Sequence, residues 1–377
     1  MKTEKHSVNI VGMIGTQRET VSNARATVSV FGGGINPGSE LPRGIDPDYI
    51  LEFARAHEDS DFDMVLTGYS SSTPDGFEVT SYAAGHTKRI GFLIAHRPGF
   101  IMPTLAARKI ATLDQLTQGR IALHIISGGS DKEQRSDGDW INHDARYRRT
   151  DEYMGLLRRI WREREPFDHE GEFYRFEDVY SQVRCFQDPN VPLYFGGASD
   201  IALEVGSKRA DVFALWGEPL SAIKERITDI TNRALSHNRK IKFSLSVRPI
   251  IGVTESEAWA RAESILQQVQ QATLGKINPG QPARLQSEGS RRLLRFAEQR
   301  DVHDDRLWMP IASASGAAGS TTCLVGTAEQ VADSLMKYFD LGCDTFIIRG
   351  FDPLQDAKEY GKDLIPLIRQ KASNRMC

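Results

Sequence analysis

Residues 90–129 read IGFLIAHRPGFIMPTLAARKIATLDQLTQGRIALHIISGG. An apolar run of strand length opens this stretch at Ile90–Ala95, and a helical pattern follows at Thr104–Leu116. Gly119 marks a tight turn, after which a second apolar run covers Ile121–Ser127. The stretch therefore predicts a βαβ unit.

The same alternation continues along the chain. Strand-length apolar runs separated by helical patterns favour a parallel sheet, and eight such runs match the strand number of a (β/α)8 barrel. The predicted strands are Val8–Met13, Met64–Thr67, Ile90–Ala95, Ile121–Ser127, Leu193–Gly196, Val212–Trp216, Phe243–Gly252 and Thr345–Arg349. The predicted helices are Pro47–His57, Thr104–Leu116, Thr150–Trp161, Ser199–Lys208, Ser221–Ser236, Ser256–Gln271, Thr327–Leu341 and Leu354–Arg369.

An open, doubly wound α/β sheet is the alternative fold. That fold places a glycine-rich phosphate turn directly after its first strand, and Gly12–Gly15 lacks the required spacing. No internal repeat or linker divides the chain. We therefore predict one α/β domain over residues 1–377, a (β/α)8 TIM barrel with insertions.

The composition excludes several classes of partner. Lysine and arginine total 47 against 50 acidic residues, a balance that predicts neither nucleic-acid nor membrane-surface binding. The four cysteines are far apart and, with the histidines, show no zinc-ligand spacing, so no metal site is predicted. The N-terminal residues lack a signal-peptide apolar region, and no stretch approaches a membrane span, so we expect a cytoplasmic protein.

Two long segments depart from the alternation. Gly15–Arg43 follows the first strand, on the face where barrel enzymes place their chemistry, and is expected to shape the mouth of the pocket. Gly275–Thr322 lies between strands seven and eight and is predicted to be a lid. Its basic residues could close over an anion, or could instead form a solvated basic face; they are Arg291, Arg292, Arg295 and Arg300.

A second informative stretch is Gly196-Gly197-Ala198-Ser199-Asp200. Two glycines let the backbone approach a ligand closely, and Ser199 stands where a helix begins. A helix N-terminus offers free N–H donors and a positive dipole end, which suit a phosphate. The plain alternative is a serine N-cap after a glycine turn.

As a pattern, the sequence closely resembles the flavin-dependent monooxygenases of the bacterial-luciferase-like superfamily, especially the alkanesulfonate monooxygenase branch. The resemblance spans nearly the whole chain. It rests on Arg97-Pro98-Gly99, Pro103-Thr104, Ala111-Thr112-Leu113-Asp114-Gln115-Leu116, Gly119-Arg120, Ser127-Gly128-Gly129, Arg146-Tyr147, Thr150-Asp151-Glu152, Leu193 to Asp200, Trp216-Gly217-Glu218-Pro219 and Leu324-Val325-Gly326. It implies a barrel that uses reduced FMN and molecular oxygen, a separate NAD(P)H-dependent flavin reductase, and a homo-oligomer.

The resemblance also implies cofactor contacts. Arg146 and Tyr147, placed just before the helix that Thr150 opens, match residues near the flavin phosphate, together with Gly197 and Ser199. The remaining matched positions are Tyr69 and Ser70 against the flavin ring, His124 where relatives often carry asparagine, and the acidic Glu133. Without the family, His124 would be a satisfied core histidine, and Arg146 and Glu133 would be surface residues.

The sequence departs from the alkanesulfonate branch at three positions. That branch carries an arginine and a histidine on strand seven and a tyrosine after strand eight, where this chain has Ser246, Arg248 and Phe351. Guanidinium groups of Arg97, Arg248 and Arg349 nevertheless predict an anionic substrate, unless salt bridges to Glu218 or Asp352 account for them. Ser70, Ser246 and Asp352 suit a hydroxylated substrate such as a sugar sulfonate, and Trp216 would stack on it or pack in the core.

These residues predict an FMNH2-dependent monooxygenase that oxygenates the carbon bearing a sulfonate and releases sulfite and an aldehyde. The proposed catalytic residues are Arg248, Arg349, Trp216 and His124, and the proposed substrate contacts are Arg97, Ser246, Arg248 and Arg349. Three alternatives stay open: a deazaflavin-dependent oxidoreductase of the same superfamily, a monooxygenase of a non-sulfonate substrate, and a non-enzymatic flavin-binding protein.

Overall fold

Eight parallel strands close into a barrel in the computed structural model, which describes residues 7–17, 44–273, 287–317, 319 and 321–376. The strands follow one another around the barrel in chain order, and pairing of the strand Val212–Trp216 with Lys242–Gly252 completes the ring. They are β1 (Asn9–Met13), β2 (Met64–Thr67), β3 (Gly91–His96), β4 (Ile121–Ile125), β7 (Leu193–Gly196), β8 (Val212–Trp216), β9 (Lys242–Gly252) and β13 (Cys343–Ile348). All eight predicted strands are confirmed, and closure rules out the open sheet.

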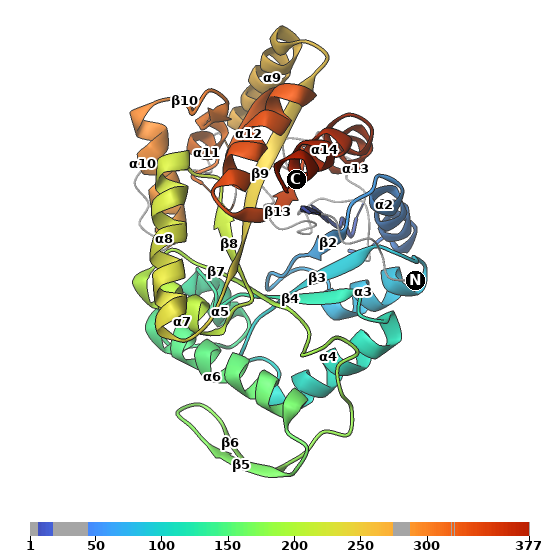
Figure 1. Cartoon of the computed structure of the whole chain (residues 1–377), viewed down its shortest axis with the longest axis vertical. Helices are drawn as coiled ribbons and strands as arrows, with labels where there is room; N and C mark the ends of the chain where they lie inside the picture. The colour runs from blue at the N-terminus through green and yellow to red at the C-terminus, as the bar shows by residue number, and fades with distance from the viewer. Residues whose placement is uncertain (1–6, 18–43, 274–286, 318, 320, 377) are drawn as a thin grey trace.

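Helices surround the barrel (Figure 1). They are α2 (Pro47–Asp59), α3 (Gly76–Gly85), α4 (Pro103–Thr117), α6 (His143–Arg162), α7 (Asp200–Arg209), α8 (Leu220–Ser236), α12 (Ala328–Asp340), α13 (Pro353–Glu359), the π-helical turn η2 (Tyr360–Leu364) and α14 (Ile365–Met376). The prediction omitted α3 and placed the start of α6 at Thr150, which was wrong. Asn142 caps this helix by accepting from the Ala145 N–H, while the Thr150 hydroxyl bonds back to the Arg146 carbonyl inside it.

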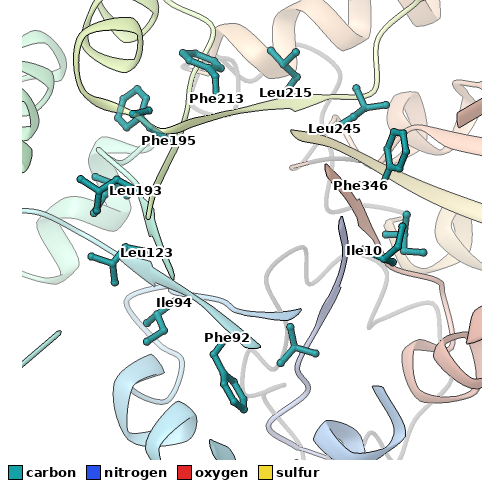
Figure 2. Close-up of a cluster of buried hydrophobic side chains, with 14 of the residues drawn as sticks. Ile10, Phe92, Ile94, Leu123, Leu193, Phe195, Phe213, Leu215, Leu245 and Phe346 are labelled. Atoms are coloured by element: carbon teal, nitrogen blue, oxygen red, sulfur yellow. The ribbon is translucent and has the colours of Figure 1, made fainter. Parts of the chain in front are cut away.

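Side chains along the barrel strands alternate between two environments, as a period of two requires. One set packs outward against the helices; Figure 2 shows Ile10, Phe92, Leu193, Phe213 and Phe346 pointing away from the barrel axis. The other set fills the barrel interior and comprises Val11, Met13, Leu66, Leu93, Ala95, Ala122, Tyr194, Val212 and Ile347. On each strand, the position two residues past the last member of this inner set, toward the carboxyl end, therefore faces the mouth of the barrel.

Two polar residues of the stretch 90–129, Asp114 and Arg120, tie neighbouring segments to the barrel. The Asp114 carboxylate is fully buried and accepts from the backbone N–H groups of Phe186 and Gln187, at 2.7 and 3.0 Å. Arg120 donates to the carbonyls of Ile90 and Ala84 at 3.0 and 2.9 Å. Both side chains satisfy loop backbone that would otherwise be buried without partners.

The segment between β9 and β13 builds a sub-structure on the extended end of β9. The strand β9 pairs with β13 as far as Val247, and from Arg248 onward it pairs with β12. The added elements are α9 (Glu255–Thr273), α10 (Glu288–Gln299), β10 (Val302–His303), β11 (Leu307–Trp308), α11 (Pro310–Ala314) and β12 (Cys323–Thr327). Part of the predicted lid, like most of Gly15–Arg43, lies outside the described residues, and the described part is packed and regular.

Two smaller insertions follow β4. They are the short helix α5 (Asp131–Ser136) and a hairpin of β5 (Phe167–Glu170) and β6 (Arg175–Val179), which projects beyond α6 in Figure 1. The Glu152 carboxylate on α6 accepts from the backbone N–H groups of Phe173 and Tyr174 at 2.9 and 3.1 Å and so holds the hairpin. Among the described helices, none has the length and apolar content that a membrane span needs.

Candidate active site

The carboxyl ends of the barrel strands bring most of the predicted residues to one mouth. Trp216 on β8 pairs in register with Ser246 on β9, and Ser246 pairs with Ile347 on β13, so these three share one layer. Because Ile347 and Val212 face inward, Trp216 and Ser246 also face the barrel interior. This layer forms one side of the mouth.

The glycine stretch after β7 forms a cradle at the N-terminus of α7. A Cβ atom added to Gly197 would lie 3.2 Å from the Tyr147 hydroxyl and 2.5 Å from Cβ of Ala202, so only glycine fits there. Ser199 is the N-cap residue, as predicted, yet its buried hydroxyl makes no capping hydrogen bond. The hydroxyls of Tyr147 and Ser199 therefore lie together beside the free N–H groups at the start of α7.

Burial shapes the chemistry of this cradle. Tyr147 is 8% exposed, and burial raises the pKa of its hydroxyl, while the Ser199 hydroxyl and the Arg146 charge act in the opposite direction. The Tyr147 hydroxyl is therefore a hydrogen-bond donor at neutral pH. We call Gly197, Ser199 and Tyr147, with the first turn of α7, the cradle.

Arg146 is adjacent in sequence but is engaged elsewhere. Its guanidinium donates to the Asp131 carboxylate at 2.8 Å and to the Ile141 carbonyl at 2.7 Å. The side chain is 2% exposed. Its charge is thus already balanced where α5 begins, and the cradle is formed by its neighbour Tyr147.

A charged network lies across the mouth, after β2, β3 and β4. Arg97 forms a salt bridge with Glu133 at 3.2 Å and approaches Asp137 at 3.9 Å. Tyr69 donates its hydroxyl proton to Asp137 at 2.8 Å, and burial together with this hydrogen bond raises its pKa. One cation therefore faces two carboxylates, so Arg97 is compensated within the protein.

The loop after β2 joins the same network. The Ser71 N–H donates to Glu133 at 3.3 Å, and the Ser70 N–H donates to the Thr73 hydroxyl at 2.9 Å in a tight turn. Glu133 thereby links the loop that carries Tyr69 and Ser70 to Arg97. The sequence did not reveal Asp137, which completes the network.

His124 lies two residues beyond Ala122 on β4 and shares a register layer with Ala95 and Tyr194. Its Nδ1 atom is buried and has no hydrogen-bond partner among the described residues. Burial lowers the pKa of His124 to about 4, so the imidazole is neutral at pH 7. A neutral ring with an unused nitrogen is not the satisfied core histidine of the plain interpretation.

The two remaining arginines occupy different surroundings. Arg248 is 4% exposed, donates to the Gly350 carbonyl at 3.4 Å and lies 4.9 Å from the Phe351 ring centroid. Arg349 lies two residues beyond the inward-facing Ile347 and places Nη1 3.4 Å from Sδ of Met13 on β1. The three predicted arginines are thus distributed around the rim.

Helix α10 is fastened to the end of β8. Arg292 binds Glu218 through two hydrogen bonds, Nε to Oε1 at 2.8 Å and Nη2 to Oε2 at 2.6 Å. A Cβ at Gly289 would lie 2.8 Å from the Trp216 ring, so the helix backbone covers that ring closely. The other basic residues of this helix, Arg291 and Arg295, pair with Glu288.

Sequence reasoning also missed Arg226 on α8. Its Nη2 donates to the Ala198 carbonyl at 3.3 Å, directly before the N-cap Ser199. No sequence signal marks this residue, because it stands in the middle of an ordinary amphipathic helix whose contact partner is set by the packing of α7 on α8.

Solved structures share this architecture across almost the whole chain. A riboflavin lyase, solved with modified FMN and riboflavin, is 19% identical and superposes with a TM-score of 0.76 over 97% of this chain and 92% of its own. EDTA monooxygenase from Chelativorans sp. BNC1 is 17% identical, with a TM-score of 0.73 over 97% and 94% of the two chains. An F420-dependent secondary alcohol dehydrogenase is 16% identical, with a TM-score of 0.65 over 96% and 99%.

These identities are low and show a shared fold. The family comparison is more specific, because the profile of the luciferase-like monooxygenase family matches residues 27–345, which include the cradle, the charged network, His124 and the barrel strands β2 to β9. The chain belongs to the luciferase-like monooxygenase family.

Proposed function

We propose that this chain is the oxygenase of a two-component system, which uses reduced FMN and molecular oxygen to oxidise an organosulfonate. The observation that carries the proposal is the cradle at the N-terminus of α7, where Gly197 leaves room and Ser199 does not cap its own helix. In a member of this family, that cradle fits the phosphate of FMN.

We expect the cofactor's ring to lie between the cradle and the charged network. Tyr69 and Ser70 would lie against the ring, and His124, with its unused Nδ1, would hydrogen-bond to it. Glu133 holds their loop in place. When bound, reduced FMN supplies the two electrons with which oxygen is split between the product and water. The riboflavin lyase, whose structure contains modified FMN, supports this choice of cofactor.

The protein's own part is to bind, orient and shield. Trp216 and Ser246 would contact the substrate from the β8–β9 side, beneath the covering helix α10. A layer that excludes water protects labile species formed during oxygenation. Tyr69 stays protonated at neutral pH because its pKa is raised, so it donates to Asp137 and not to a substrate group.

A carbon bearing the sulfonate gains one oxygen atom from O2, the carbon–sulfur bond breaks, and the electron pair of that bond leaves with sulfite. The carbon becomes an aldehyde, and the second oxygen atom leaves as water. Arg349 and Arg248 would recognise the sulfonate oxygens, since guanidinium groups pair with such anions.

The hydroxyl groups at the mouth favour a hydroxylated sulfonate. Ser246 shares a layer with Trp216, and Ser70 stands on the opposite rim. The Ser70 hydroxyl already accepts from the Ser72 N–H at 3.4 Å, and a sugar-like substrate would add hydrogen bonds to polar side chains at the mouth that a bare alkyl tail cannot make. Asp352, the N-cap of α13, accepts from the Gln355 N–H and is therefore partly engaged.

The deciding measurement is sulfite release from a panel of simple and hydroxylated sulfonates. An unrelated NAD(P)H-dependent flavin reductase would supply reduced FMN, in place of the chain's own reductase partner. We expect release from one class, dependent on reduced FMN and oxygen. Reduced FMN bound without sulfite release from any member would reject the sulfonate and favour another anion, such as the polycarboxylate named for EDTA monooxygenase.

A deazaflavin-dependent oxidoreductase is the second candidate, because an F420-dependent alcohol dehydrogenase shares the fold. Binding of F420 but not of FMN in a fluorescence titration would favour it. A flavin-binding protein without activity would bind reduced FMN yet consume no oxygen beyond the rate of free FMN. We further expect a homo-oligomer, which light scattering would measure.

A further inference from the structure

Arg226 lies at the entrance to the cradle. It is half-buried in the second turn of α8, and its Nη2 donates to the carbonyl of Ala198 at 3.3 Å. Ala198 directly precedes Ser199, the N-cap of α7. The guanidinium is therefore held next to the helix end at which Gly197, Ser199 and Tyr147 gather.

This position is electrostatically unfavourable without an anion. A helix N-terminus carries a partial positive charge and repels cations. No carboxylate among the described residues lies within salt-bridge distance of Arg226, whereas Arg233 on the same helix pairs with Asp200 and Asp229. A half-buried cation in such a place costs free energy unless a counter-charge arrives.

The surrounding charges do not supply that counter-charge. Among the acidic residues near Arg226, Glu218 raises its pKa most. The Glu218 carboxylate, however, is already bound by both arms of Arg292. Burial and the nearby Arg292 lower the pKa of Arg226, although an arginine remains charged at neutral pH. Of the other acidic residues nearby, Asp229 binds Arg233 at 2.9 Å and Glu225 is exposed on the same helix, so no carboxylate of the described residues is bound to Arg226.

On the opposite rim the charge balance is reversed, because the single cation Arg97 lies near two carboxylates, those of Glu133 and Asp137. A phosphate in the cradle would therefore meet an arginine that has no salt-bridge partner among the described residues, whereas Arg97 on the opposite rim is already paired.

We infer that Arg226 binds the phosphate of FMN and makes the site select the phosphorylated flavin over riboflavin. This inference rests on the proposed use of FMN, but not on the proposed sulfonate. A charge-assisted hydrogen bond to phosphate contributes enough for an effect of roughly 10- to 100-fold on affinity.

The test compares two ligands and three variants. Dissociation constants for reduced FMN and reduced riboflavin would be measured anaerobically in wild type, Arg226→Gln, Arg226→Lys and Lys224→Gln. Lys224→Gln is the matched control, because it removes a positive charge from an exposed position two residues away on the same helix. Thermal unfolding of each variant establishes that it is folded. If Arg226→Gln is not folded, Arg226→Lys, which retains the charge, takes its place.

We expect Arg226→Gln to weaken FMN binding at least about tenfold and to leave riboflavin binding unchanged. The FMN affinity of Arg226→Lys should lie between those of wild type and Arg226→Gln. The FMN affinity of Lys224→Gln should equal that of wild type. The wild-type preference for FMN should also decline with salt more steeply than that of Arg226→Gln. The inference would be overturned if folded Arg226→Gln, or Arg226→Lys in its place, bound FMN as tightly as wild type. It would also be overturned if the variant lost equal affinity for FMN and for riboflavin. Failure of wild type itself to bind reduced FMN would instead reject the proposed function.

Discussion

The guanidinium carbon of Arg97 lies 4.4 Å from the centroid of the Tyr69 ring, and the Tyr69 hydroxyl donates to Asp137. Arg97 also pairs with Glu133, so a single side chain holds together the loops after β2, β3 and β4. Its compensated charge makes Arg97 a structural element of the mouth. We therefore keep only Arg248 and Arg349 as the proposed anion-binding residues.

This arrangement predicts the effect of Arg97→Met. The change leaves Glu133 and Asp137 facing each other without their cation, and we expect a loss of about 3 kcal/mol in the free energy of unfolding. Urea denaturation measures this loss, with the exposed Arg108→Met on α4 as a control that should change stability by less than about 0.5 kcal/mol. Unchanged stability with a raised substrate KM would return Arg97 to the substrate-binding residues.

A methyl group at Gly197 should close the cradle. The added Cβ of Gly197→Ala would meet Ala202 at 2.5 Å and the Tyr147 hydroxyl at 3.2 Å, so the cradle backbone or Tyr147 must move. We expect FMN affinity to fall by at least about tenfold, the equivalent of one lost charge-assisted hydrogen bond. Gly85→Ala is the control, because nothing lies within 4 Å of its Cβ. Equal FMN affinity in both variants would remove the cradle from the cofactor site.

The barrel was predictable because its signals are local. Each strand is a short apolar run, and alternation with helices is visible without knowledge of contacts. The start of α6 was misplaced because Thr150 resembles a helix cap, whereas its hydroxyl bonds within the helix and Asn142 supplies the cap. Similarly, β12 was missed because its apolar residues, Cys323–Thr327, pair with the extension of β9 and not within the barrel.

The candidate site was predictable only in part. The turn at Gly197 and Ser199 has its own chemical signature, and inward-facing positions follow from strand alternation. The charge balance of Arg97 and the place of Arg226 depend on partners that lie 40 and 28 positions away, Asp137 and Ala198. Such pairings arise from the packing of helices and loops, so no pattern in the sequence reports them.

The bidentate pair between Arg292 and Glu218 predicts how α10 is retained. Arg292→Gln removes both hydrogen bonds and leaves the nearly buried Glu218 carboxylate without the salt bridge that it makes among the described residues. We expect faster amide hydrogen exchange over residues 288–299, because local opening becomes less costly. Arg295→Gln lies on the same helix and loses only the more exposed contact with Glu288, so its exchange should resemble wild type. Equal protection in the two variants would contradict the role of the pair.

The buried histidines predict a specific dependence of stability on pH. Burial lowers the pKa values of His57, His96 and His124 to about 4, below the ordinary 6.5. The unfolded chain therefore binds protons first as the pH falls, so stability is complete above about pH 6.5 and declines between 6.5 and 4. Each histidine contributes up to roughly 3 kcal/mol to this decline.

His124→Asn isolates one of these contributions, because asparagine retains a hydrogen-bonding side chain that does not titrate. We expect the variant to lose less stability than wild type between pH 7 and pH 5, measured as the change in free energy of unfolding by urea. His86→Asn alters an exposed histidine at the end of α3 and should follow the wild-type curve. Parallel curves for His124→Asn and wild type would mean that the pKa of His124 is the same in the folded and unfolded protein, which would contradict an imidazole kept neutral by burial down to pH 5.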